Sequence, residues 1–386
     1  MHDAVTVNGV RLAYRVDGPR DGPVVAFANS LGTTMALWDR EVALLSGGFR
    51  VLRYDLRGHG GSAAPPGPYT MGQLGEDLVG LLDALGIARV SLCGLSIGGM
   101  VALQVAGAHP ERVERLVVAC SAPALPPASS WRDRAAAVRA GGVSPLTEAL
   151  FSRWFTPEVR AARPSVVTAV GEMLATCDPE GYAACCEAIA GSDLGPRLGA
   201  ISAPTLVIAG NDDPVAPPMV GLEMARAIGD ASFVTLAGAA HLAHLNQPER
   251  FASALVDHLA GAPRERGMAV RRFVLGDAHV ERALARETDF TAPFQDFITR
   301  YAWGEIWSRP GLERKIRSAI TVAMLVALGR IEELSFHAPA ALRNGLSEDE
   351  LREILLQCAV YAGVPAANSA FAAVAAVLAG ASDGER

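Results

Sequence analysis

The chain has 386 residues, half of them apolar, and a formal net charge of −7. That length predicts two or three domains with ample material for hydrophobic cores. The mild acidity and the lack of a basic stripe exclude nucleic acid and an anionic membrane surface as expected partners. We find no secretory signal at the N-terminus and no run of about 18 apolar residues that could span a membrane.

None of the six cysteines forms a C-x-x-C pair, and their spacing suits neither a zinc site nor a disulfide framework. We expect most of them to be small buried apolar residues. Free thiols and the missing signal predict a cytoplasmic protein.

The first 260 residues alternate short strands with helices. Residues 5–15 alternate in polarity around Asn8-Gly9, which is typical of a hairpin. The other expected strands are short continuous apolar runs, at 23–28, 51–55, 90–93, 113–119, 204–210 and 232–236. The helices among them are expected at 38–45, 71–85, 220–228 and 248–259, with a further apolar helix after residue 96. Buried strands that alternate with helices predict a mostly parallel sheet covered on both faces.

A long helical stretch interrupts this alternation. Between about residues 126 and 198 no strand is expected, only helical segments rich in Ala, Arg and Trp. An all-helical insertion at this point predicts a lid, at about 124–200, over the active site.

The pattern changes again after residue 260. Residues 261–267 are short, polar and rich in helix-breaking residues, so we expect a linker there. Beyond it the pattern is wholly helical, and Ser347 to Glu350 form a capping box. The helices are expected at 278–286, 293–306, 312–328, 331–344, 347–361 and 365–378. We therefore expect a second, all-α domain at 268–386.

One stretch of the first domain carries the predicted chemistry. Gly94-Leu95-Ser96-Ile97-Gly98 follows a short buried strand and precedes an apolar helix. G-x-S-x-G in that context is the nucleophile elbow of the α/β-hydrolase fold, a sharp turn that exposes the serine hydroxyl. Glycines at 94 and 98 remove the clashes that this strained turn would create. Ser96 is therefore the predicted nucleophile.

A serine nucleophile needs a histidine base and an acid that orients the base. In this fold the acid and the histidine follow the serine along the chain. Asp213 comes just after the strand at 204–210, and His241 comes just after the strand at 232–236. Both side chains should therefore reach the sheet edge that carries Ser96.

Each of these choices has an alternative. Asp212 competes with Asp213, and one of the two is expected to cap the next turn. His244 competes with His241, which we prefer because it lies nearer the end of its strand. His59 follows another strand, but the glycines around it indicate a turn.

The oxyanion hole should combine two backbone amides. One is the amide of Ile97, the residue after the nucleophile. The other comes from the small-residue loop Asn29-Ser30-Leu31-Gly32 after an earlier strand, where we choose Leu31. The Ser30 side chain is a further candidate contact to substrate.

These motifs carry a family resemblance. Residues 1 to about 260 resemble α/β-hydrolases of the 3-oxoadipate enol-lactonase group, although esterases and cofactor-free haloperoxidases share most of the motifs. The resemblance implies that Ser96, Asp213 and His241 open an enol-lactone. It rests on Asn29-Ser30-Leu31-Gly32, Asp55-Leu56-Arg57-Gly58-His59-Gly60, the elbow, Gly210-Asn211-Asp212-Asp213, and His241 with Gln247-Pro248-Glu249.

The substrate of such an enzyme carries an acetate arm, which needs a cation or hydrogen-bond donors. The predicted lid offers Arg132, Arg134 and Arg153 beside two tryptophans, and the sequence leaves open which of them is used. As substrate-binding residues we take Ser30, Trp131, Arg132 and Trp154.

The helical second domain carries its own resemblance. Residues from about 267 to 380 resemble 4-carboxymuconolactone decarboxylases, through the stretches 297–307, 309–312, 317–318, 329–337 and 361–368. Related thiol peroxidases use a C-x-x-C pair, and this domain has only Cys358, so a thiol peroxidase is excluded.

Decarboxylation of 4-carboxymuconolactone requires no metal or pyridoxal, because the unsaturated lactone carbonyl accepts the electron pair by conjugation. No cofactor is therefore expected. His337 is the candidate proton carrier, and Glu333, one helical turn earlier, is the candidate group that orients it. Arg317 and Arg330 are candidates for binding carboxylates. Trp303 and Trp307 are expected to be core or pocket wall.

Together the two resemblances predict a bifunctional enzyme of protocatechuate breakdown. The second domain would make 3-oxoadipate enol-lactone, and the first would hydrolyse it to 3-oxoadipate. The partners are then small lactones, and the thin helical domain is expected to form a homo-oligomer. One alternative is a general esterase or perhydrolase with a C-terminal oligomerisation domain. Another is a ligand sensor, which would have no need of a complete triad.

Overall fold

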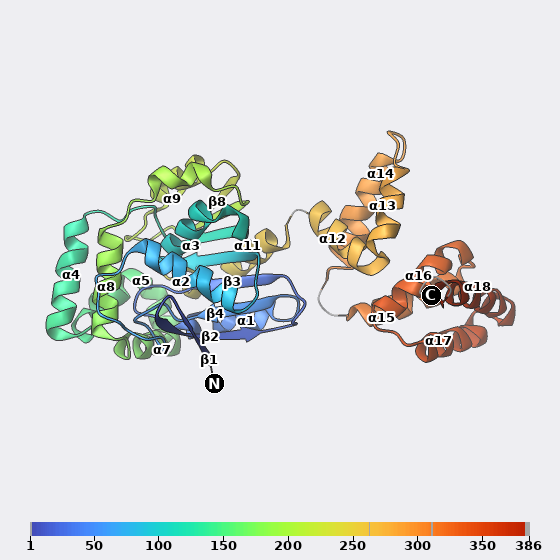
Figure 1. The fold of residues 1–386 in the computed structure, drawn as a ribbon, viewed down its shortest axis with the longest axis horizontal. Coiled ribbons are helices and arrows are strands. Elements are labelled where there is room, and N and C mark those ends of the chain that lie inside the picture. Colours follow the sequence, from blue (N-terminus) through green and yellow to red (C-terminus); the bar gives the residue numbers. More distant parts are fainter. Residues whose placement is uncertain (1, 262, 310–311, 383–386) are drawn as a thin grey trace. The chain divides into compact units, whose positions relative to one another are not determined.

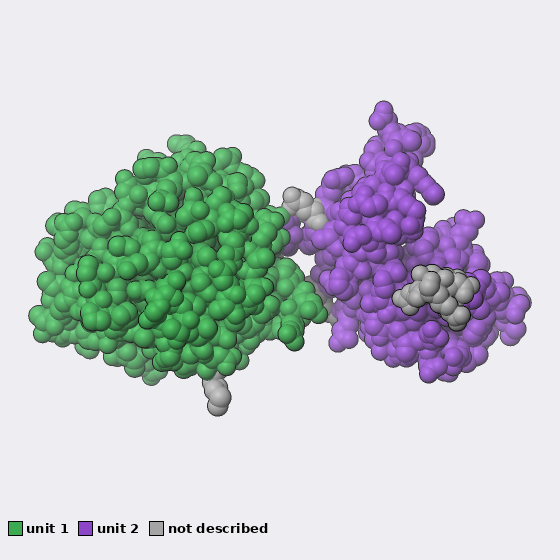
Figure 2. Space-filling model, in the orientation of Figure 1, with its two compact units in different colours: residues 1–259 green, residues 260–386 purple. Residues whose placement is uncertain are grey.

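The computed structural model describes residues 2–261, 263–309 and 312–382. It divides into two compact units, Met1–Leu259 and Ala260–Arg386 (Figures 1 and 2). Each unit has hydrophobic clusters of its own. Ala262 of the predicted linker lies outside the described residues, as do Pro310 and Gly311 of the stretch 309–312.

The first unit is built on one eight-stranded sheet. The hairpin of the first two strands and the pairing of β2 with β4 are antiparallel, and every other pair is parallel. All positions of β5 and β7 are buried, which explains why their sequences are mostly apolar and do not alternate in polarity. In spatial order the strands are β1 (Asp3–Val7), β2 (Val10–Asp17), β4 (Arg50–Tyr54), β3 (Val24–Ala28), β5 (Val90–Leu95), β6 (Val113–Ala119), β7 (Thr205–Gly210) and β8 (Ala231–Leu236).

Helices flank this sheet and complete the α/β-hydrolase fold that the sequence predicts (Figure 1). The largest fully buried side chains of the chain, Trp38 and Tyr54 among them, belong to its core. The helical elements are η1 (Met35–Trp38), α1 (Asp39–Leu45), α2 (Met71–Ala84), α3 (Ile97–Ala108), η2 (Pro110–Arg112), α9 (Pro218–Ala227), α10 (Ala243–Asn246) and α11 (Pro248–Ala260).

The segment between β6 and β7 contains only helices as regular elements, as expected for a lid. The lid comprises α4 (Ala128–Gly141), η3 (Ser144–Leu146), α5 (Thr147–Trp154), α6 (Pro157–Ala162), α7 (Pro164–Ala175), α8 (Pro179–Ala190) and η4 (Gly195–Ala200). It is anchored close to the sheet edge, because the N–H groups of His241 and Leu242 donate to the carbonyl oxygens of Arg153 (3.2 Å) and Trp154 (3.1 Å).

The described part of the second unit is entirely helical. It contains α12 (Pro263–Leu275), α13 (Asp277–Ala285), α14 (Ala292–Ile298), the π-helix η5 (Thr299–Ile306), α15 (Arg314–Ala327), α16 (Ile331–Arg343), α17 (Glu348–Tyr361) and α18 (Val364–Ser382). The capping box at α17 is confirmed, since the side chains of Ser347 and Glu350 bond to each other's backbone amides. The six cysteines are free and buried, as expected of small apolar residues.

The prediction of a linker at 261–267 is wrong for most of its length, because α12 begins at Pro263. Proline is compatible with the first turn of a helix, where its missing N–H has no acceptor. Gly267 is not a helix breaker here. It lets α12 approach η5, since a Cβ at this position would lie 1.8 Å from the carbonyl oxygen of Thr299.

Within the described ranges, the structure contains no helix that is both long enough and apolar enough to cross a membrane.

Candidate active site

Ser96 sits at the sharp turn between β5 and α3, with φ +59° and ψ −120°. This left-handed backbone is strained for a residue with a side chain. The turn closes only because its neighbours lack side chains. A Cβ at Gly94 would lie 2.1 Å from the carbonyl oxygen of Gly98, and a Cβ at Gly98 would lie 2.2 Å from that of Ala28. The elbow thus holds the serine hydroxyl above the N-terminus of α3.

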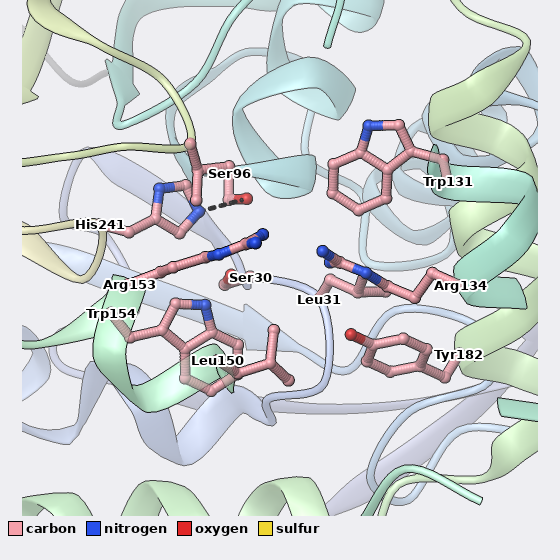
Figure 3. Close-up of a pocket in the computed structure, with 11 residues that line it drawn as sticks. Ser30, Leu31, Ser96, Trp131, Arg134, Leu150, Arg153, Trp154, Tyr182 and His241 are labelled. Atoms are coloured by element: carbon pink, nitrogen blue, oxygen red, sulfur yellow. Dashed lines mark hydrogen bonds between the residues drawn. The ribbon is translucent and has the colours of Figure 1, made fainter. Parts of the chain in front are cut away.

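Hydrogen bonds join the three predicted catalytic residues of this unit in one line. The Nε2 atom of His241 lies 2.8 Å from Oγ of Ser96 (Figure 3). Its Nδ1 atom lies 2.9 Å from Oδ2 of Asp213. All three side chains are buried. The arrangement can deprotonate the serine and hold the imidazolium that results.

The structure also separates the alternatives. Asp213 is fixed by the backbone N–H groups of Val215 (2.8 Å) and Ala216 (3.2 Å), both of which donate to Oδ1, whereas Asp212 is exposed. His244 lies in the core, with its ring 4.8 Å from that of Trp38, and burial lowers its pKa to about 3.

The loop with the expected oxyanion donor follows β3. Leu31 and Ser30 are buried residues that line the same pocket as Ser96. Ile97 is the first residue of α3, where a backbone N–H has no acceptor within the helix. Both residues that are expected to supply the amides therefore lie beside the nucleophile.

His59 supports this loop, a role that the sequence analysis did not assign. Its Nε2 atom accepts a hydrogen bond from the N–H of Gly32 at 2.9 Å, and its Nδ1 atom lies 3.2 Å from the carbonyl oxygen of Arg57. Burial lowers the pKa of His59 to about 4, so the ring is neutral near pH 7 and Nε2 can accept. Asp55 adds a second support by accepting from the N–H of Met35 at 2.6 Å.

The pocket beside Ser96 is lined mainly by the lid (Figure 3). Two of the predicted substrate-binding residues, Trp131 and Trp154, are in its wall together with Ser30. Arg134 and Arg153, two of the three arginines that the sequence offered for the acetate arm, also line the pocket, and the lining residues that the sequence analysis did not name are Leu150, Tyr182 and Val215.

Arg132, one of the three lid arginines among which the sequence left the choice open, is exposed and is not among the residues that line this pocket. Residues three apart share a helix face, so Arg134 lies beside Trp131 on α4, with its guanidinium carbon 4.5 Å from the ring centre. Helical spacing from Trp131 is the signal that would have selected it. In Figure 3, Arg134 from α4 and Arg153 from α5 both point into the space near Ser96.

His337 and Glu333, the catalytic candidates of the second unit, lie one turn apart on α16 and are partly buried. Burial, reinforced by the charge of His279 and opposed by that of Glu333, lowers the pKa of His337 to about 4. No hydrogen bond joins the two side chains.

The two candidate carboxylate-binding arginines are not brought to His337 by any hydrogen bond or ion pair among the described residues. Arg317 donates to the carbonyl oxygen of Arg309 at 2.9 Å. Arg330 is exposed at the start of α16. Trp303 and Trp307 pack with ring centres 5.2 Å apart in a hydrophobic cluster, as expected for core. Within the described ranges, no group of three or more His, Cys, Asp or Glu side chains could hold a metal ion.

Comparison with known proteins extends this picture to both units. A model of the Alpha/beta hydrolase family matches residues 25–254, more than half of the chain. The chain belongs to this family. A model of the Carboxymuconolactone decarboxylase family matches residues 292–376, and the C-terminal unit belongs to that family. The resemblances inferred from the sequence motifs are thus confirmed, and the chain is a fusion of the two.

Individual relatives agree with this division. A 3-oxoadipate enol-lactonase of Acinetobacter baylyi is 39% identical over 249 residues, which cover 64% of this chain and 93% of the relative. A 4-carboxymuconolactone decarboxylase of the same organism is 53% identical over 106 residues, which cover 28% of this chain and 79% of the relative. The crystal structure of an enol-lactonase from Burkholderia xenovorans is 42% identical, covers 67% of this chain and 100% of its own, and has a TM-score of 0.66.

Proposed function

We propose that the protein converts 4-carboxymuconolactone to 3-oxoadipate in two consecutive steps. The C-terminal unit removes carbon dioxide to give 3-oxoadipate enol-lactone, and the N-terminal unit hydrolyses that lactone. The observation that carries the proposal is the line of hydrogen bonds from Asp213 through His241 to Ser96. It stands in a pocket with two arginines, on a chain whose other unit is of the decarboxylase family.

In the hydrolytic step, His241 takes the proton of Ser96 as its oxygen attacks the lactone carbonyl. The amides of Leu31 and Ile97 hold the oxyanion, and Asp213 stabilises the imidazolium. The ring C–O bond breaks, and the enol that leaves becomes the ketone. His241 then activates a water molecule, which releases the acid from Ser96.

Two cations of the pocket fit the acetate arm of this lactone. Neither Arg134 nor Arg153 forms an ion pair with a described carboxylate, and both side chains line the pocket of Ser96. An arginine can bind a carboxylate with two parallel hydrogen bonds. We assign the carboxylate to these two residues, with Ser30, Trp131 and Trp154 as the surrounding wall.

In the decarboxylation step, the bond between the ring carbon and the departing carboxylate breaks. Its electron pair passes into the unsaturated lactone, and a proton then returns to carbon. A neutral His337 beside Glu333 suits this exchange, because the negative charge of a bound substrate raises the pKa of a nearby histidine. His337 would then carry the proton, and Glu333 would orient the ring.

The test supplies purified full-length protein with 4-carboxymuconolactone. The wild type should release carbon dioxide and 3-oxoadipate, and Ser96→Ala should release carbon dioxide but accumulate the enol-lactone. A wild-type protein that leaves the compound unchanged yet hydrolyses simple esters would overturn the proposal in favour of a general esterase.

We also propose that the second unit assembles with further copies of itself. Of the exposed large hydrophobic side chains in the described residues, all but Leu44 and Met219 belong to this unit. They include a stripe along α15 formed by Ile316, Ile320 and Met324. Light scattering after gel filtration should give a multimer for the wild type and a smaller species for the double variant Ile320→Glu, Met324→Glu. A monomeric wild type would contradict this.

A cytoplasmic location is part of the same proposal, because six free thiols fit a reducing compartment.

A further inference from the structure

Arg271 on α12 is a buried cation that forms no ion pair with any carboxylate of the residues that the structure describes. Only 5% of the residue is exposed, and its Nε atom is buried without a hydrogen-bond partner. Among the described residues, its guanidinium forms one long hydrogen bond, from Nη1 to the hydroxyl of Thr299 at 3.3 Å. Glu287 lies near enough to favour its charge but forms no ion pair with it in the described structure.

This isolation is costly, and it contrasts with the next residue along the helix. A buried charge without a partner destabilises the fold, and an arginine side chain stays protonated, so it cannot remove this cost by becoming neutral. Arg272 is ion-paired with both Asp277 (3.1 Å) and Glu281 (2.6 Å). An anion that entered beside Arg271 would remove the cost and would be held by charge-assisted hydrogen bonds.

The surroundings of Arg271 lead to the candidate catalytic residues of this unit. His279 on α13 lies close enough to Arg271 for the two charges to interact. The ring of His279 is 4.9 Å from that of Phe336, which in turn is 4.9 Å from the ring of His337. The charges of His279 and Glu333 both act on His337. His279 therefore lies between Arg271 and the predicted proton carrier, so a negative ligand bound by Arg271 and His279 would reach the surroundings of His337.

We propose that Arg271 and His279 form a carboxylate-binding subsite of the C-terminal unit, adjacent to His337 and Glu333. The assignment rests on the proposed decarboxylation for the identity of the substrate, but not for the binding of a carboxylate. Arg271 binds the anion, and the imidazole of His279 donates a further hydrogen bond. This subsite takes the place that Arg317 and Arg330 were expected to fill.

The chemistry indicates which of the substrate's carboxylates Arg271 holds. Decarboxylation moves negative charge out of the departing carboxylate and into the lactone. A guanidinium on the departing group would stabilise the ground state more than the transition state and would slow the reaction. Arg271 therefore anchors the carboxylate that stays on the product, which affects binding more than turnover.

The first experiment measures binding without catalysis. Succinate is titrated calorimetrically into the full chain carrying Arg134→Met and Arg153→Met, which silences the hydrolase pocket. We expect saturable binding that Arg271→Met weakens about 10- to 100-fold, the effect of removing a charged hydrogen-bond partner. Arg272→Met is the matched control and should bind succinate as well as the background does. Equal binding with and without Arg271, or no binding in the background, would overturn the subsite.

The second experiment separates binding from folding. With 4-carboxymuconolactone, Arg271→Met should raise KM about 10- to 100-fold and change kcat little. In the absence of ligand its melting temperature should not fall below that of the wild type, because no ion pair is lost. A lower melting temperature with an unchanged KM would mean a structural role and would contradict the proposal. Arg271→Lys keeps the charge but not the fork of donors, and it should raise KM about 10-fold even if Arg271→Met does not fold.

The two proposals can fail separately. A wild-type protein that does not decarboxylate 4-carboxymuconolactone overturns the proposed function, while the succinate titration still decides whether Arg271 binds carboxylates.

Discussion

The two units organise their candidate catalytic residues in different ways. In the first unit, Ser96, His241 and Asp213 are buried and joined by hydrogen bonds of 2.8 and 2.9 Å. In the second unit, His337 and Glu333 are only partly buried and share no hydrogen bond, and apolar side chains such as Val360 remain 75% exposed. The first unit thus holds an assembled site within its own fold. In the second unit, as we propose, the bound substrate and further copies of the chain complete the site.

The sharpest test of this contrast removes the acid of the first unit. Asp213→Asn should lower kcat for the enol-lactone about 10⁴-fold, because the imidazole loses the partner that sets its tautomer. Carbon dioxide release from 4-carboxymuconolactone should not change. The exposed neighbour Asp212 offers the control Asp212→Asn, which should be nearly as active as the wild type in both assays. If Asp213→Asn lowered the rates of both reactions to a similar extent, the two units would not act independently and the contrast would be wrong.

The reverse experiment acts on the second unit. His337→Gln should slow carbon dioxide release about 10²- to 10⁴-fold, the usual contribution of a general acid or base. Hydrolysis of added enol-lactone by the same variant should remain at the wild-type rate, which also verifies that the protein is folded. Unimpaired decarboxylation would exclude His337 as the proton carrier.

A smaller effect is expected at His59, which lies outside the line of the triad. His59→Leu removes the acceptor for the Gly32 N–H and loosens the loop that carries the Leu31 amide. We expect kcat for the lactone to fall about 10- to 100-fold, a part of what loss of an oxyanion donor costs, with KM little changed. His59→Gln, whose amide oxygen can accept the same hydrogen bond, should recover part of the rate. A rise in KM alone would indicate a different role.

The smallest expected effect is on acid stability, and it concerns the buried core of the first unit. His244 has a pKa of about 3 in the folded chain, against an ordinary value of 6.5, because burial disfavours its charged form. The unfolded state therefore binds the extra proton first, so stability is present above pH 6.5 and is lost as the pH falls toward 3. At pH 5 the loss from this group amounts to about 2 kcal/mol relative to pH 8.

Urea unfolding of the wild type and of His244→Leu at pH 8 and pH 5 measures this contribution. The drop in unfolding free energy between the two pH values should be about 2 kcal/mol smaller in the variant. His59, with a pKa of about 4, titrates in the same range and should account for part of the drop that remains. Identical drops in the two proteins would show that His244 does not control acid stability.

The sequence by itself determined the architecture of the first unit. The sharp turn at Ser96 requires glycine at positions 94 and 98, because a side chain at either position would collide with the backbone. Asp213 and His241 follow parallel strands, and the carboxyl ends of such strands meet at one edge of the sheet. The local sequence at the turn and the order of the strands were therefore sufficient to predict these three residues.

Only the tertiary structure decided which lid arginine enters the pocket, what supports the oxyanion loop and where α12 begins. The sequence offered Arg132, Arg134 and Arg153, and the packing of α4 turns the face with Trp131 and Arg134 toward the pocket. His59 and Gly32 are brought together by the neighbouring strands β3 and β4, and Gly267 is required by the contact with η5. Only the tertiary structure likewise shows that the Nε atom of Arg271 is buried without a hydrogen-bond partner. For His59, Gly267 and Arg271 the deciding neighbours are distant along the chain, so no local pattern predicts these contacts.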